Sequence, residues 1–360
     1  MLKLLRILSM VTVVLAGLGL QSCKEDIDFS GEKTNTALVF GLLNQADSIH
    51  YIKITRAFGG DNNGIIVAQI PDSSYFPVMT AKIIEAGGAN RTWILRDTML
   101  DGKTPGAFYG PIQKVYYFKA ALNESATYKL DINVNNDEFH VTGETKLVTG
   151  VTISAPTGNT PFNFSSSNAA DEGYKSTSIV CTKGNSAVIN CQLETFIKEF
   201  INGVPVEKSF RTTLGELSGS QLPGNPSFIA DGKSFYTNIA ANCTNDPLIP
   251  RRQFSRIRIH ITAGSEDLAK YILINKPSTS LAQNKSTFTN LEATNDARVI
   301  GLFSARVSIM NEKLKYQPSN PLVRGITPFS MKELCTGQIT GSFNFCSDNP
   351  NDQLLSYYCD

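Results

Sequence analysis

The chain is dominated by short segments in which apolar and polar residues alternate one by one. Residues 49–56 (IHYIKITR) place Ile52 and Ile54 on one face, and residues 127–134 and 254–262 repeat the pattern. Alternation with a period of two predicts strands that pack one face on a core and turn the other to solvent.

Turn signals separate these segments. Further strands are expected at residues 80–86, 92–96, 115–120, 138–148, 195–200, 206–213 and 298–310. Residues 87–90 (GGAN) predict a turn, and Asn202-Gly203 is the strongest short-range signal for a hairpin. One stretch, residues 266–274, fits a helix instead, with Ser265 as its N-cap.

This spacing of strands and turns predicts an all-β protein. We expect an immunoglobulin-like or carboxypeptidase-regulatory-like β-sandwich at residues 34–150. A second, mainly β domain with one short helix should follow at residues 151–360. The boundary is placed near Gly150 because residues 157–173 are rich in Pro, Asn, Ser and Gly.

The first residues have the pattern of a signal peptide, which we place at residues 1–22. Lys3 and Arg6 precede an uncharged, mostly apolar run at residues 7–20. A spanning helix needs about 20 apolar residues, so this run is too short to be one.

The end of that run predicts a lipid anchor. Leu20-Gln21-Ser22-Cys23 resembles a bacterial lipobox, so cleavage before Cys23 and acylation of its sulfur are expected. Several acyl chains hold a protein on a membrane durably, whereas one chain binds marginally. Lys24, Glu25 and Asp26 resemble the export signal of Bacteroidota lipoproteins, which implies the outer face of the outer membrane. Residues 23–33 then form a polar tether.

Net charge and cysteine count narrow the class of protein further. The formal net charge is +1, which argues against a nucleic-acid binder. Of the seven cysteines, six remain after Cys23, an even number that favours disulfides in an exported protein. They are Cys181, Cys191, Cys243, Cys335, Cys346 and Cys359. Cys181 and Cys191 bracket an expected hairpin and are paired with each other, which leaves Cys243 as a partner for one of the C-terminal three.

The sequence offers little catalytic chemistry, so no enzyme activity, cofactor or metal is expected. His50, His140 and His260 each lie in an alternating strand and are interpreted as surface residues. No nucleophile motif accompanies them, and no CxxC pair indicates zinc. The oxygen-rich segment Asp348–Asp352 is interpreted as a turn rather than a calcium site.

Aromatic and basic residues give the remaining candidate binding groups. Trp93, the only tryptophan, should pack in the core, whereas Tyr357 and Tyr358 are candidates for an exposed glycan-binding surface. A local basic patch is formed by Arg251, Arg252, Arg256 and Arg258. An anion could bind this patch, but a solvated face is the preferred interpretation.

Several segments together resemble an uncharacterised family of Bacteroidota outer-membrane lipoproteins. They are the lipobox, Gly106-Ala107-Phe108-Tyr109, the strand Ala126–Leu130 and the segment Thr289–Ala305. The likeness covers most of the mature chain, but its motifs are structural. Members are often encoded beside TonB-dependent receptors, which implies such a receptor as a partner and carries no site residue over.

These observations favour a non-enzymatic, surface-exposed lipoprotein that acts as an accessory to a TonB-dependent transporter or an outer-membrane assembly. Two alternatives stay open. One is a glycan-binding or ligand-binding surface module, and the other is an adhesin or fimbrial subunit built by strand addition.

Overall fold

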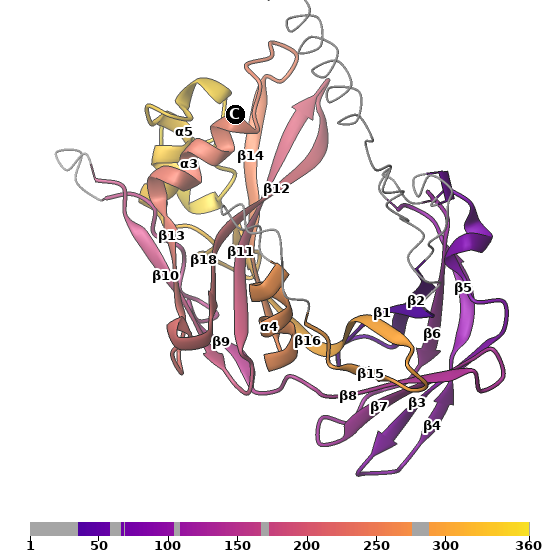
Figure 1. Cartoon of the computed structure of the whole chain (residues 1–360). Helices are drawn as coiled ribbons and strands as arrows, with labels where there is room; N and C mark the ends of the chain where they lie inside the picture. Colours follow the sequence, from indigo (N-terminus) through magenta and orange to yellow (C-terminus); the bar gives the residue numbers. More distant parts are fainter. Residues whose placement is uncertain are drawn as a thin grey trace, which may run out of the picture.

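The computed structural model describes residues 35–57, 66–67, 69–103, 109–166, 173–275 and 288–359. Within these residues the chain forms eighteen strands and only three full α-helices. The predicted all-β class is therefore confirmed. Figure 1 shows the first strands gathered at one end of the molecule and helices α3 and α5 at the other.

The largest sheet has eight strands in the order β12-β11-β14-β16-β1-β2-β6-β5. Their bounds are β1 Thr36–Leu43, β2 Ile49–Arg56, β5 Arg96–Leu100, β6 Gln113–Lys119, β11 Val188–Ile201, β12 Val204–Ser218, β14 Arg251–Gly264 and β16 Arg298–Leu314. Neighbouring strands are antiparallel except β1 and β16, which run parallel from Thr36 and Arg298 onward.

A five-stranded sheet, β15-β8-β7-β3-β4, covers the β1, β2 and β6 end of the large sheet (Figure 1). Its strands are β3 Met79–Ala86, β4 Thr92–Ile94, β7 Thr127–Val134, β8 Phe139–Lys146 and β15 Leu291–Ala293. Ile52 and Ile54 are buried between the sheets, as the alternation predicts. The ring of Trp93 lies 5.5 Å from that of Phe118, so the tryptophan packs against the core. The predicted sandwich is present.

Strands from the far end of the sequence complete both of these sheets. β16 pairs with β1, and β15 pairs with β8. Both β15 and β16 lie beyond Gly150, where the boundary between the two domains was placed. One hydrogen-bonded sheet therefore contains strands from both sides of that boundary. The two-domain division stays a prediction.

The end of the molecule opposite the sandwich combines a small sheet with two helices (Figure 1). The three-stranded sheet β13-β10-β9 consists of β9 Val151–Ala155, β10 Ser176–Lys183 and β13 Ser227–Asp231. The remaining elements are α3 Gly232–Ala241, α5 Pro328–Thr336, and the short pair β17 Tyr316–Gln317 and β18 Asn320–Arg324. The buried hydroxyl of Tyr236 in α3 donates to the carbonyl oxygen of Ser330 in α5 at 3.0 Å. This bond and the stacking of Phe235 on Phe164, at 4.0 Å between ring centroids, fix the position of α3.

The short helix that the sequence predicts is present, and two further helices form in the described residues. The predicted one is α4, Glu266–Asn275, where the Ser265 hydroxyl accepts from the Leu268 backbone N–H at 3.4 Å. α3 and α5 were missed because both are short and rely on packing for their stability. Their capping residues, Asp231 and Thr327, were the available signals.

The cysteines differ from the expected arrangement. Cys346 and Cys359 form a disulfide, whereas Cys181, Cys191, Cys243 and Cys335 are buried thiols. The expected Cys181–Cys191 bond is wrong because the two cysteines do not share a hairpin. Cys181 lies on β10 in the small sheet and Cys191 on β11 in the large one. Cys243 likewise has no disulfide partner in the described part of the chain. Burial raises the pKa of Cys181 to about 11, so this thiol is protonated at neutral pH.

A buried carboxylate, that of Glu85, binds the turn at one end of the sandwich. Glu85 has no exposed surface, because it follows Ala81 and Ile83 on the core face of β3. Its carboxylate accepts from the Arg91 guanidinium at 2.6 Å and from the Ala89 backbone N–H at 3.0 Å. These donors fasten the turn at residues 87–90 to the sheet.

Glu85→Gln should therefore lower the free energy of unfolding by about 2 kcal/mol at neutral pH. The Arg91 guanidinium holds the pKa of Glu85 below its ordinary value of 4.5. Its contribution is full above pH 4.5 and is lost as the pH falls through the lower folded-state pKa. Urea unfolding at pH 7, 5, 4 and 3 should show the difference from wild type shrinking below pH 4.5. Glu144→Gln, which alters an exposed ion pair with Lys129, should have little effect at any pH. A difference for Glu85→Gln that is independent of pH would contradict the assignment.

Candidate functional site

An open groove lies between α4 and the outer face of β1, β2 and β16. Its volume is about 360 Å³. Seven aromatic and aliphatic side chains line it, and we call this site the aromatic groove: Phe40, Leu42, Ile49, Tyr51, Leu268, Tyr271 and Leu302. Asp47 and Arg306 add one charge of each sign to the lining.

Strand alternation explains why aromatic rings face outward here. On β1, Val39 and Leu43 point into the sandwich, so Phe40 points away from it and is 37% exposed. On β2, Tyr51 lies between the buried His50 and Ile52 and is 43% exposed. The outward ring of Tyr51 could have been inferred from the sequence, since Ile52 and Ile54 mark the inner face.

Helix α4 forms the other wall of the groove. A Cβ added at Gly264 would lie 2.7 Å from Leu268 Cδ2, so the glycine allows α4 to approach the sheet closely. This approach brings Tyr271 edge-on to Phe40, with 6.1 Å between ring centroids. The groove is thus built from three separate regions of the chain, joined by the β1–β16 pairing and by α4.

The aromatic groove is mainly apolar, with two charged side chains in its lining. Arg306 and Asp47 are exposed, and neither makes an ion pair with another described residue. His50 is buried, contrary to its interpretation as a surface residue, because it shares the core face with Ile52. Burial lowers the pKa of His50, so its ring is neutral at pH 7. The groove therefore offers aromatic surface and two rim charges rather than acid–base chemistry.

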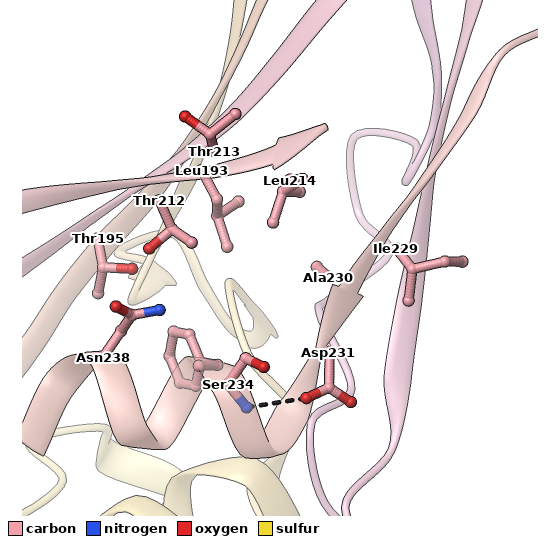
Figure 2. Close-up of a pocket in the computed structure, with 11 residues that line it drawn as sticks. Leu193, Thr195, Thr212, Thr213, Leu214, Ile229, Ala230, Asp231, Ser234 and Asn238 are labelled. Carbon is pink, nitrogen blue, oxygen red and sulfur yellow. Dashed lines mark hydrogen bonds between the residues drawn. The ribbon is translucent and has the colours of Figure 1, made fainter. Parts of the chain in front are cut away.

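A second hollow, which we call the polar cavity, lies between α3 and strands β11 and β12 (Figure 2). Its volume is about 200 Å³. Polar side chains contribute much of its lining: Thr195, Thr212, Thr213, Asp231, Ser234 and Asn238. These residues carry no sequence signal of a site, because threonine, serine and asparagine are common in strands and turns. Only the packing of α3 brings them together.

The predicted basic patch is not a solvated face: Arg252 is completely buried, and Arg256 and Arg258 are half-buried and paired with carboxylates. Arg256 pairs with Glu207 at 2.6 Å, and Arg258 pairs with Glu312 at 2.6 Å. The aromatic ring of Phe196 lies beneath both guanidinium groups. Little uncompensated positive charge is left here to attract an anion.

The remaining histidines are held by acidic neighbours. His260 lies 2.8 Å from the Glu194 carboxylate, and His140 lies 3.1 Å from Asp137. Burial raises the pKa of Glu194, but the hydrogen bonds from His260 and Arg211 outweigh it and lower that pKa. No cluster of metal-binding side chains occurs among the residues that the structure describes.

The C-terminal candidates are also structural. Tyr357 is buried, so its expected exposure is wrong: the Cys346–Cys359 disulfide folds this segment back onto the body. The segment Asp348–Asp352 is a turn, as interpreted: it contains a short 3-10 helix at Pro350–Asp352, and Asp352 pairs with Arg324 at 3.1 Å.

The predicted signal peptide, Cys23, the export residues Lys24, Glu25 and Asp26, and the tether lie outside the described residues. So do Gly106, Ala107 and Phe108. From residue 35 onward, where the structure is described, each helix is too short or too polar to cross a bilayer.

Comparison with known proteins places the chain in no family. The sequence matches no known protein family and no curated protein. Among solved structures, the C-terminal globular domain of an oligosaccharyltransferase from Pyrococcus abyssi aligns with 57% of this chain at 12% identity. The TM-score is 0.20, and the chain spans 42% of that structure. Two folds at this TM-score are too different for any property to be transferred.

Proposed function

We propose that this chain is an outer-membrane lipoprotein, anchored through acylated Cys23 and exposed at the cell surface. In this proposal the folded part is a non-enzymatic accessory of an outer-membrane transporter, such as a TonB-dependent receptor, and contacts it through the aromatic groove. The observation that carries the proposal is the exposure of Phe40 and Tyr51 beside α4.

The composition of the groove fits a protein partner. The cores of protein interfaces are enriched in aromatic residues and arginine, and a few such residues supply most of the binding energy. Phe40, Tyr51 and Tyr271 provide the aromatic surface, and Arg306 lies at its rim. A hydrophobic surface of this kind costs solubility unless a partner covers it.

A double variant, Phe40→Ser with Tyr51→Ser, tests this contact. We expect its recovery with the barrel from detergent-solubilised outer membranes to fall at least tenfold, because losing about 2 kcal/mol of binding weakens a complex by more than that factor. Quantitative mass spectrometry of affinity-purified material gives the measurement. Neither side chain is in the core, so the variant should still fold, which circular dichroism can check.

Leu322→Ser is the matched control, since Leu322 is 76% exposed on β18 and lies outside the groove. It should leave recovery unchanged. Repeated isolation of the wild-type lipoprotein without any outer-membrane barrel would overturn the proposed partner, and equal recovery of the groove variant would overturn the proposed surface.

A further inference from the structure

Three polar side chains in the polar cavity have unused hydrogen-bonding capacity. Figure 2 shows Thr195, Thr212 and Asn238 pointing toward the same part of the cavity. Thr195 is only 3% exposed. None of the three side chains makes a hydrogen bond to another described residue. Thr212 and Asn238 are half-buried, so the open side of the cavity leaves the hydrogen-bonding capacity of these groups to water or to a ligand.

The sheet register and the helix period bring these groups together. Thr195 follows Leu193 on the core face of β11, and the register places Thr212 of β12 directly opposite Leu193. Asn238 lies four residues after Ser234, on the same face of α3. Three secondary-structure elements therefore contribute one hydrogen-bonding group each, which is how a specific site is built.

The charge of the cavity selects against anions. Asp231 is the one charged side chain among its lining residues, and no lysine, arginine or histidine is among them. The Asp231 carboxylate accepts from the Ser234 backbone N–H at 2.8 Å and from the Ser176 hydroxyl at 3.2 Å. The Ser234 N–H lowers the pKa of Asp231, which keeps the carboxylate negative at neutral pH. A negatively charged ligand would meet the Asp231 carboxylate, and the lining residues supply no cation to offset the repulsion.

Shape and size narrow the ligand further. Leu193, Leu214 and Phe235 supply apolar wall between the polar groups. The volume of about 200 Å³ is below the 300 Å³ or more of sites for drug-sized ligands. The hydroxyl and carboxamide groups of the cavity both donate and accept hydrogen bonds, and so do the hydroxyls of a sugar. The C–H faces of a sugar ring can pack against the apolar wall.

We infer that the polar cavity binds one neutral sugar unit, with Thr195, Thr212 and Asn238 hydrogen-bonded to its hydroxyls. This activity goes beyond the proposed accessory role. It would give the lipoprotein a means of capturing a glycan end or a free monosaccharide at the membrane where it is anchored.

Saturation-transfer NMR and calorimetry on the soluble chain from residue 24 onward test this inference. The probes are glucose, galactose, mannose and N-acetylglucosamine, with glucuronate and galacturonate as charged counterparts. At least one neutral sugar should bind, and its uronic acid should bind at least tenfold more weakly. Thr195→Val should weaken binding of the neutral sugar about tenfold or more, because one hydroxyl partner is lost.

Thr195→Val also separates binding from folding. The Thr195 hydroxyl has no partner within the described protein, so its removal should leave the melting temperature of the sugar-free protein unchanged or raise it. Thr152→Val, in an exposed threonine pair on β9 and β10, should change neither property. Failure of every neutral sugar to bind would mean that the cavity holds only water. Equal binding of uronic acids, or unaltered binding by Thr195→Val, would also overturn the inference. Co-purification of the outer-membrane transporter through the aromatic groove is measured in a separate experiment. Its result does not depend on whether the polar cavity binds a sugar.

Discussion

Replacing Arg252 by methionine should lower the free energy of unfolding by about 3–5 kcal/mol. Arg252 is completely buried at the start of β14. Its guanidinium donates to the Glu199 carboxylate at 2.9 Å and to the carbonyl oxygens of Phe343 and Thr244, each at 2.8 Å. Methionine fills much of the same volume but leaves all three acceptors without a donor.

The expected loss is large because Arg252 joins three parts of the chain. Glu199 lies on β11, Thr244 follows α3, and Phe343 precedes the disulfide-bonded C-terminal segment. Urea unfolding monitored by fluorescence gives the measurement, with the Cys346–Cys359 bond intact in all samples. Arg258→Met is the matched control, since Arg258 lies on the same strand in a partly exposed ion pair and should cost less than about 1 kcal/mol. An Arg252→Met protein within 1 kcal/mol of wild type would show that this network contributes little.

Replacing Cys23 by alanine should abolish retention of the protein on the membrane. Each buried methylene of an acyl chain contributes about 0.8 kcal/mol, so several chains on one cysteine hold a protein durably on the membrane. The wild-type protein should remain in the outer-membrane pellet after a wash with concentrated salt and dissolve only in detergent. The Cys23→Ala protein should leave the outer membrane, and its precursor should keep residues 1–22.

Fractionation followed by immunoblotting measures both effects. Cys243→Ala provides the control, because it removes a thiol buried in the folded body and leaves the predicted lipobox unaltered. It should fractionate like the wild type. A Cys23→Ala protein of wild-type size that is still found in the outer membrane would contradict the proposed anchor.

Local pattern predicted individual strands well and their partners poorly. Residues 127–134 alternate cleanly, and β7 has those bounds. The Asn202-Gly203 turn joins β11 and β12 as expected, with both residues at positive φ. The parallel pairing of β1 with β16, in contrast, joins residues 262 apart at Thr36 and Arg298. No local signal encodes that contact, so the sheet that runs through the molecule could not be predicted.

The candidate sites were less predictable still. Thr195, Thr212 and Asn238 are ordinary residues in sequence and become a site only when α3 packs over β11 and β12. The cysteine spacing did not predict the disulfide, because residues 181 and 191 lie on strands that pair with different partners. Their buried thiols show that nearness in sequence does not fix a disulfide partner when the chain passes from one sheet to another.

The proposed lipid anchor depends most on the identity of the mature N-terminus. Mass spectrometry of the N-terminal peptide, taken from protein purified out of native membranes, tests it most directly. We predict a peptide that begins at Cys23 and carries a diacylglyceryl thioether together with an N-acyl group. A peptide that begins at another residue, or an unmodified Cys23, would show that the chain is not held to the membrane in this way.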